Sequence, residues 1–478
     1  MKNLPLQLID DLVVDIINRC QVIEDRSLHL SQGEFSSENP ARFAKLISCI
    51  SSALIPQIVI LRNKFDKDQS NVLINIRFID ELVRELGAHL RYIDGAATIK
   101  LPWSITLPLE SLCKRFLPNT TLMLRPQWKY NYAILTEDIG KVYKRAFSEV
   151  FRDNKEKLDK LFTDFPVDFH IISFPSIERK SALLHCDLGH EIGHLIAKQF
   201  LESEDKTYLI DFQGKIIAKV KDETKENPLP PILEVIEIGE KIKSAILFRR
   251  RGLEEIISDI FGIRLLGPAA LFALFQIAFS DSLDISPIET PSYYPPWRTR
   301  LRFCIETLEL TGMIPIRETD YPIPNFSQHK QCIQARIDEI RNITLNQSDK
   351  NNIEKDWLVK LAYDSIYNTI PALEKFLTNN YGDKFISPES LYRQVYPLVH
   401  RLIKDIVPNA LELPLQNSEP ADMEAILNAS WFYRLSYLND NFPNGQLNKK
   451  FKQRYDILNR LTLKAVELSH IQKLYIKK

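Results

Sequence analysis

This sequence of 478 residues has little glycine and no net charge. It also has no closely spaced cysteine pairs and no long apolar runs. Only 14 residues are glycine, and long segments carry apolar residues at helical spacing, so we expect a mostly helical chain. Lysine plus arginine and aspartate plus glutamate both number 62, which leaves no net charge. This balance creates no bulk attraction to nucleic acid or to an acidic membrane surface, so we expect no nucleic-acid partner.

The cysteines and the apolar segments indicate a cytoplasmic protein. The six cysteines include no closely spaced pair of the kind that zinc knuckles use, and we interpret them as free thiols in a reducing compartment. Asp10 and Asp11 interrupt the apolar N-terminal segment, which predicts an amphipathic helix and not a signal peptide. The most apolar run, Leu265–Phe279, is shorter than the roughly 20 residues that a membrane-spanning helix needs. We therefore expect a buried core helix there and no membrane span.

A chain of this length is too long for one hydrophobic core, so we expect two or three domains. Residues 1–98 show helical spacing and predict an N-terminal helical region, and residues 313–478 predict a C-terminal helical region. The middle region, 99–312, mixes strand-like and helical patterns. The fold class is therefore expected to be α+β, predominantly helical with a small sheet.

The strand-like patterns of the middle region lie in four segments. Short runs of β-branched and aromatic residues predict strands within 99–112, 120–135 and 167–174. Two alternating runs around Gln213-Gly214 predict a β-hairpin at about 207–223, inserted between two helical patterns. The first of these helices is expected to start near Pro175-Ser176, and the second runs from Ile232 to about Leu266.

The segment LLHCDLGHEIGHLIAKQF, residues 183–200, carries the first candidate site. His190 and His194 are one helical turn apart, so both imidazoles can point at one ion, and we expect them deep in a helix. Glu191 lies about 100° around the helix from His190, beside the ion, where a general base for a metal-bound water would lie. Zinc binds two imidazoles plus a carboxylate and leaves a fourth position for water, so we expect one Zn²⁺ per chain.

A second helix offers the carboxylates that such a site needs. Residues 252–262 read GLEEIISDIFG, in which Glu255 and Asp259 are one turn apart on one face. One of them can bind the ion, and the other can accept the outer N–H of a ligating histidine. Glu254 is the competitor, although it points about 100° away around the helix. For Asp259 the alternative is a salt bridge with Arg264 or a role at the helix end.

The two stretches together resemble the zinc motifs of the gluzincins, the thermolysin-like metallopeptidases, over about 30 residues. The resemblance implies a zincin-like core with a zinc site built on two helices, in which His190, His194 and Glu255 are the zinc ligands. It also implies that Glu191 is the general base and that Asp259 hydrogen-bonds a ligand histidine. Glu254 stands where the family has an asparagine, and no counterpart of the family's downstream histidine is found.

The function that follows is a zinc-dependent metallopeptidase acting on a protein or peptide. A zinc-bound water activated by Glu191 would attack a peptide carbonyl, and Glu191 would pass the proton to the leaving amine. We expect an endopeptidase, because the sequence has no GxMEN element of the kind that holds a free amino terminus in aminopeptidases of this class. The alternative is a non-catalytic interaction or scaffold protein with a structural zinc, which Glu191 argues against because a structural site needs no base.

Two further features leave alternatives open. Cys186 lies one turn before His190 and is interpreted as a buried core cysteine, the alternative being an inhibitory thiolate at the metal. The stretch SYYPPWRTRLRF, residues 292–303, places Tyr294 before two prolines and three alternating arginines. Tyr294 or an arginine can donate to a developing oxyanion. The alternative is a helix start whose arginines pair with the acidic helix.

Overall fold

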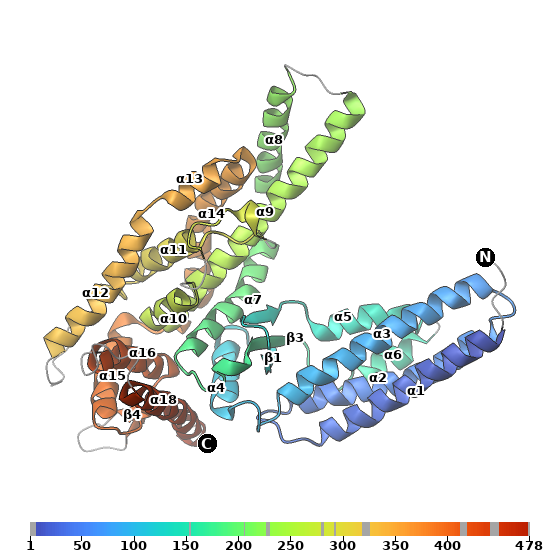
Figure 1. Cartoon of the computed structure of the whole chain (residues 1–478), viewed down its shortest axis with the longest axis horizontal. Coiled ribbons are helices and arrows are strands. Elements are labelled where there is room, and N and C mark those ends of the chain that lie inside the picture. The colour runs from blue at the N-terminus through green and yellow to red at the C-terminus, as the bar shows by residue number, and fades with distance from the viewer. Residues whose placement is uncertain are drawn as a thin grey trace. The chain divides into compact units, whose positions relative to one another are not determined.

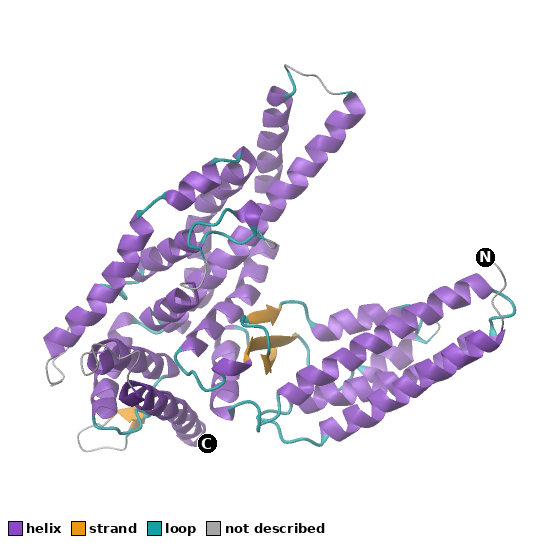
Figure 2. Ribbon diagram, viewed as in Figure 1, coloured by secondary structure: helices purple, strands orange, loops and turns teal. Residues whose placement is uncertain are grey.

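The structure, a computed structural model, is mainly helical with a small sheet, which confirms the coarse fold class (Figure 2). It divides into two compact units, Met1–Arg179 and Lys180–Lys478. The described residues are 6–152, 154–204, 206–225, 230–278, 282–290, 293–317, 326–411, 418–439 and 449–476. The division into regions 1–98, 99–312 and 313–478 stays a prediction.

The first unit begins with three long helices that bury their apolar stripes against one another, as their sequence spacing predicts. Asp68 caps the third helix by accepting a hydrogen bond from the Asn71 backbone N–H. The second helix is long and apolar enough to cross a membrane by length and composition alone, but Phe43, Ile47 and Leu54 on its inner face belong to this core. The helices of this unit are α1 (Leu6–Ser31), α2 (Asn39–Asn63), α3 (Gln69–Gly95), α4 (Trp103–Phe116), α5 (Ile139–Ser148) and α6 (Lys155–Leu161).

A three-stranded sheet completes the first unit. Its strands are β1 (Thr121–Gln127), β2 (Ala133–Leu135) and β3 (Phe169–Pro175), in the order β1-β3-β2. β1 pairs parallel to β3, and β2 pairs antiparallel to it. β3 is buried along its whole length, as expected of a central strand. The strands predicted within 120–135 and 167–174 are therefore confirmed.

The second unit is built around one long helix, α9 (Pro231–Leu266), which packs against α7 (Leu188–Ser203), α11 (Trp297–Leu310) and α14 (Trp357–Tyr381). α9 starts at a proline, which is favourable at the first helical position, and ends at Gly267 with φ of 60°. α8 and the first part of α9 form a hairpin of two helices (Figure 1). The remaining elements are α8 (Lys206–Glu223), α10 (Pro268–Ala278), α12 (Phe326–Leu345), α13 (Ser348–Glu354), α15 (Pro388–Ile403), α16 (Met423–Tyr433), α18 (Lys449–Ile476), β4 (Ala410–Leu411) and β5 (Glu419–Pro420).

Three local predictions are wrong. The strand predicted within 99–112 is part of α4, in which Ile105, Leu109 and Leu112 are buried at helical spacing. The hairpin predicted at 207–223 is the helix α8. The helix that carries His190 and His194 begins at Leu188, after a short 3-10 turn (η2, Leu184–Asp187), so the histidines lie near its start and not deep within it. The predicted helix of 232–266 and the buried helix within 265–279 are confirmed by α9 and α10.

Candidate metal centre

The candidate site forms where α7 and α9 approach each other closely. Gly193 of α7 lies against the backbone of α9, and a Cβ at this position would be 2.6 Å from the Cα of Ser258. Gly262 of α9 also lies near α7, where a Cβ would be 3.1 Å from the backbone nitrogen of His190. Because these glycines have no side chains, the two backbones can approach closely enough for the α7 histidines to meet the α9 carboxylates.

The two histidines and Glu255 come together as the sequence predicts. Nε2 of His190 lies 3.5 Å from Oε2 of Glu255, and Nε2 of His194 lies 3.9 Å from Oε1 of the same carboxylate. Ligand atoms bound tetrahedrally to a zinc ion are separated by about 3.4 Å, given metal–ligand distances near 2.1 Å. The three side chains therefore need only small adjustments to enclose one ion.

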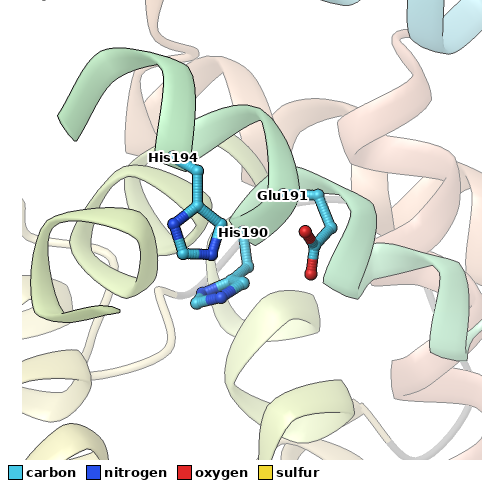
Figure 3. A group of neighbouring side chains, drawn as sticks. All are labelled: His190, Glu191 and His194. Carbon is cyan, nitrogen blue, oxygen red and sulfur yellow. The ribbon is translucent and has the colours of Figure 1, made fainter. Parts of the chain in front are cut away.

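Glu191 lies beside the two imidazoles, on the same helix. The candidate ligand atoms of His190, Glu191 and His194 all lie within 4.8 Å of one another, and Figure 3 shows the three side chains on one side of α7. All three side chains are largely buried, and Oε2 of Glu191 has no hydrogen-bond partner. A buried His/Glu/His group of this kind can bind a metal ion.

Asp259 is placed against His190, one turn along α9 from Glu255. Nδ1–H of His190 donates a hydrogen bond of 2.8 Å to Oδ1 of Asp259. This bond fixes the ring so that Nε2 faces Glu255. The alternative partner, Arg264, instead donates to Glu374 of α14 at 2.5 Å.

Glu254 is placed away from the centre. Its carboxylate accepts hydrogen bonds from Arg250 at 3.0 Å and from Arg251 at 2.9 Å, both on the outer face of α9. Glu254 thus pairs with arginines on the outer face of α9, whereas Glu255 lies in the buried centre. The two side chains point in different directions because successive helical residues are rotated by about 100°.

Arg300 of α11 is a member of the centre that the sequence did not single out by itself. Its guanidinium donates to both oxygens of Asp259, at 2.7 and 2.8 Å, and its Nη1 lies 3.2 Å from Oε2 of Glu255. Of the arginines in 292–303, Arg300 alone pairs with the acidic helix among the described residues, so the predicted alternative holds for this one arginine. The neighbouring Arg298 and Arg302 pair with Asp284 and Asp349.

The charges of the centre affect the pKa of the Tyr294 phenol. Its side chain is 40% exposed, and partial burial, followed by the negative charge of Glu255, raises its pKa. Its backbone N–H donates to Oγ1 of Thr290 at 2.8 Å. Tyr294 is thus a partly accessible phenol near the buried carboxylates.

Cys186 is a core cysteine, which was the favoured interpretation. It is buried in η2, and burial raises its pKa far above the usual range of a thiol. A hydrogen bond with the indole of Trp431 acts in the opposite direction but is the smaller effect. An inhibitory thiolate at the metal is therefore disfavoured.

The buried carboxylates in and beside the centre outnumber its arginine side chains. The centre and the turn before it hold four buried carboxylates, those of Asp187, Glu191, Glu255 and Asp259, and the buried Arg300 pairs with the last two. Burial raises the pKa of Glu191 to about 8 and that of Asp187 to about 6. Burial lowers the pKa of His190, but the adjacent Asp259 carboxylate outweighs this effect and raises it to about 9. A cation between the histidines and Glu255 would stabilise the ionised carboxylates.

Comparisons of the chain with protein-family models, with curated proteins and with solved structures found no match. The geometry and charge of the centre therefore carry the functional inference by themselves, and the gluzincin resemblance stays a prediction.

Proposed function

We propose that this protein is a zinc-dependent metallopeptidase. The observation that carries the proposal is a buried set of two imidazoles and one carboxylate, His190, His194 and Glu255, beside a second carboxylate, Glu191, whose Oε2 has no partner. Two nitrogens and one carboxylate oxygen form the donor set that zinc uses in catalytic sites, where a fourth position stays open. When bound there, zinc supplies a Lewis acid for a water molecule and a carbonyl oxygen.

The residues around the ligands hold them in place. Asp259 keeps His190 in the tautomer whose Nε2 is free to bind, and Arg300 holds Asp259 through two hydrogen bonds. Arg300 also neutralises part of the negative charge of the Glu255 and Asp259 carboxylates. The centre is thus oriented by hydrogen bonds from two helices besides α7.

Glu191 is the proposed general base. It accepts a proton from the attacking water and returns it to the nitrogen of the leaving amine. A structural zinc site would not need this carboxylate. An ionisable group whose oxygen is buried without a partner destabilises the protein, and such groups are found most often at functional sites. Glu191 therefore favours catalysis over the alternative of an interaction or scaffold protein with a structural zinc.

Tyr294 is the proposed donor to the oxyanion that develops on the substrate carbonyl. Its phenol is partly exposed, and its pKa responds to the charges of Glu255 and Glu191. A phenolic O–H can donate a hydrogen bond to an oxyanion at neutral pH. The substrate is proposed to be a protein or peptide cleaved internally. The location is proposed to be the cytoplasm, which the free state of the six cysteines supports.

The experiment that tests the function is the Glu191→Gln variant, assayed on a mixed peptide library with zinc content measured in parallel. Glutamine keeps the shape of the side chain but cannot accept the proton, so turnover should fall by at least about 10²–10⁴-fold while zinc is retained. Glu254→Gln removes a carboxylate one residue from a ligand but outside the centre, and it should keep full activity. Wild-type turnover in Glu191→Gln, or no cleavage by the native protein with zinc bound, would end the proposal.

A further inference from the structure

Asp187 is a carboxylate of the centre that the proposed mechanism does not use. It is the last residue of η2 and lies one turn before Glu191. On a helical wheel it falls between His194 and Glu191, about 40° from Glu191. It therefore belongs to the face of α7 that carries the candidate metal ligands and the proposed base.

Asp187 is largely buried, but its carboxylate oxygens keep access to solvent. Its residue is only 8% exposed, and within the described part of the chain its carboxylate makes no hydrogen bond or ion pair. It also does not cap α7, because no side-chain hydrogen bond to the first turn is formed. Glu255 and Asp259, in contrast, are both held by Arg300 and lie beside His190. Because the Asp187 carboxylate is unpaired and accessible, it can accept a hydrogen bond from a cationic group of a ligand.

The charge of Asp187 acts on the centre itself. It interacts electrostatically with His190, Arg300, Asp259 and Glu255, and also with Glu191. A divalent ion and Arg300 together balance three of the four buried carboxylates. One negative charge is left over when the metal is bound, and it is available to a positively charged group of a substrate.

The proposed reaction indicates which substrate residue would supply that group. Glu191 returns a proton to the leaving nitrogen, so this nitrogen must lie within hydrogen-bond distance of the Glu191 carboxylate. Residues one turn apart on a helix have Cβ atoms about 5–6 Å apart, so Asp187 lies within reach of a long side chain on the residue that carries this nitrogen.

Resting on the proposed function, we propose that Asp187 binds the side chain of a lysine or arginine that directly follows the scissile bond. The chain is then a peptidase that selects a basic residue on the leaving-group side. The ammonium or guanidinium would form a charge-assisted hydrogen bond with the Asp187 carboxylate. Asp187 is thus a specificity-determining residue.

The test compares two peptides that differ only in the side chain at this position. One carries lysine after the scissile bond, and the other carries acetyl-lysine, which has no charge. The native protein with zinc bound should cleave the lysine peptide with a kcat/KM higher by on the order of 10- to 100-fold, as expected when a buried charged partner is lost. An equal kcat/KM for the two peptides overturns the inference, and this comparison needs no variant to fold.

Two variants then assign the preference to Asp187. In Asp187→Asn the ratio of the two kcat/KM values should fall to about one, whereas Asp187→Glu, which keeps the charge, should retain part of the preference. Glu254→Gln is the matched control, and it should keep the native ratio. An unchanged ratio in Asp187→Asn contradicts the inference. A loss of zinc in Asp187→Asn also contradicts it, because Asp187 would then be a fourth metal ligand.

The outcomes separate this inference from the function on which it rests. If the zinc-loaded native protein cleaves no peptide of a mixed library, the metallopeptidase function fails and the inference fails with it. If it cleaves peptides through Glu191 but ignores the charge after the scissile bond, only the role of Asp187 is wrong.

Discussion

Arg300 is the residue that most directly holds the carboxylates of the centre in place. It donates two hydrogen bonds to Asp259 and lies 3.2 Å from Glu255, and all three residues are buried. Removing one partner of a buried ion pair leaves an uncompensated charge, which is far more destabilising than losing an exposed pair.

We expect Arg300→Gln to lower the free energy of unfolding by about 3–5 kcal/mol. Arg250→Gln is the matched control, because Arg250 also bonds a glutamate of α9 but is well exposed, and its loss should cost under about 1 kcal/mol. Urea unfolding followed by circular dichroism measures both variants. Equal losses in the two variants would show that Arg300 is not the central counter-ion of the centre.

Three acidic residues in the second half of α9 should differ in their effect on zinc affinity, in the order Glu255, Asp259, Glu254. Glu255→Ala removes a ligand and its charge, so it should be the most damaging. Asp259→Ala removes only the partner of His190, so it should weaken zinc binding by roughly 10–100-fold. Glu254→Ala should change little, since this side chain is held outside by Arg250 and Arg251. Competition with a chelator at fixed pH gives the order, and a largest loss in Glu254→Ala would contradict the geometry.

The sequence predicted those residues of the centre that lie one helical turn apart. It did not predict contacts between residues that are far apart along the chain. His190, His194, Glu255 and Asp259 are two pairs one turn apart, and both pairs lie on helices. Arg300 could not be assigned, because its partner Asp259 is 41 residues away and sequence spacing does not fix that contact. Asp187 was missed because its place on the metal-facing side depends on where α7 begins.

The element that builds the centre is the close packing of α7 on α9. The backbones approach so closely at Gly193 that a Cβ would meet the Cα and carbonyl oxygen of Ser258, at 2.6 and 2.7 Å. Backbone atoms cannot move aside as the tip of a flexible side chain can. The two helices would have to separate, and the distances from the histidines to Glu255 would increase with them.

We therefore expect Gly193→Ala to destabilise the protein by about 1–3 kcal/mol and to weaken zinc binding. Gly239→Ala is the control on α9, because a Cβ there meets no atom within 4 Å. In that open helical position alanine should stabilise by roughly 0.5–1 kcal/mol. Thermal unfolding with and without zinc measures both effects. A neutral Gly193→Ala would mean that the two helices are not in such close contact.

Helical spacing of apolar residues predicted the helices correctly in most places. It was overruled wrongly in α8 and α4, where the strand and turn preferences of individual residues were given more weight. In α8, Phe212, Ile216 and Val220 are buried at intervals of four residues, which is a helical stripe. The β-branched residues and Gln213-Gly214 nevertheless suggested a hairpin, although Gly214 lies in the open and needs no turn. In α4, β-branched and aromatic residues suggested a strand, but tertiary burial of the apolar stripe outweighs their lower helix propensity and that of Pro108.

At the scale of the whole molecule, every residue assigned to the centre lies within the unit Lys180–Lys478. The proposed ligands and base come from α7 and α9, and Arg300 comes from α11. The protein as a whole carries no net charge. The proposed activity is therefore expected to depend on the local excess of buried carboxylates, which a bound cation would compensate.

Whether His190 and His194 bind zinc is decided by the zinc content of the purified native protein and of the His190→Ala/His194→Ala double variant. We expect about one zinc per native chain and almost none in the double variant, because two of the three proposed ligands are gone. Both proteins should be folded by circular dichroism, which excludes loss of zinc through unfolding. Stoichiometric zinc in a folded double variant would contradict the account.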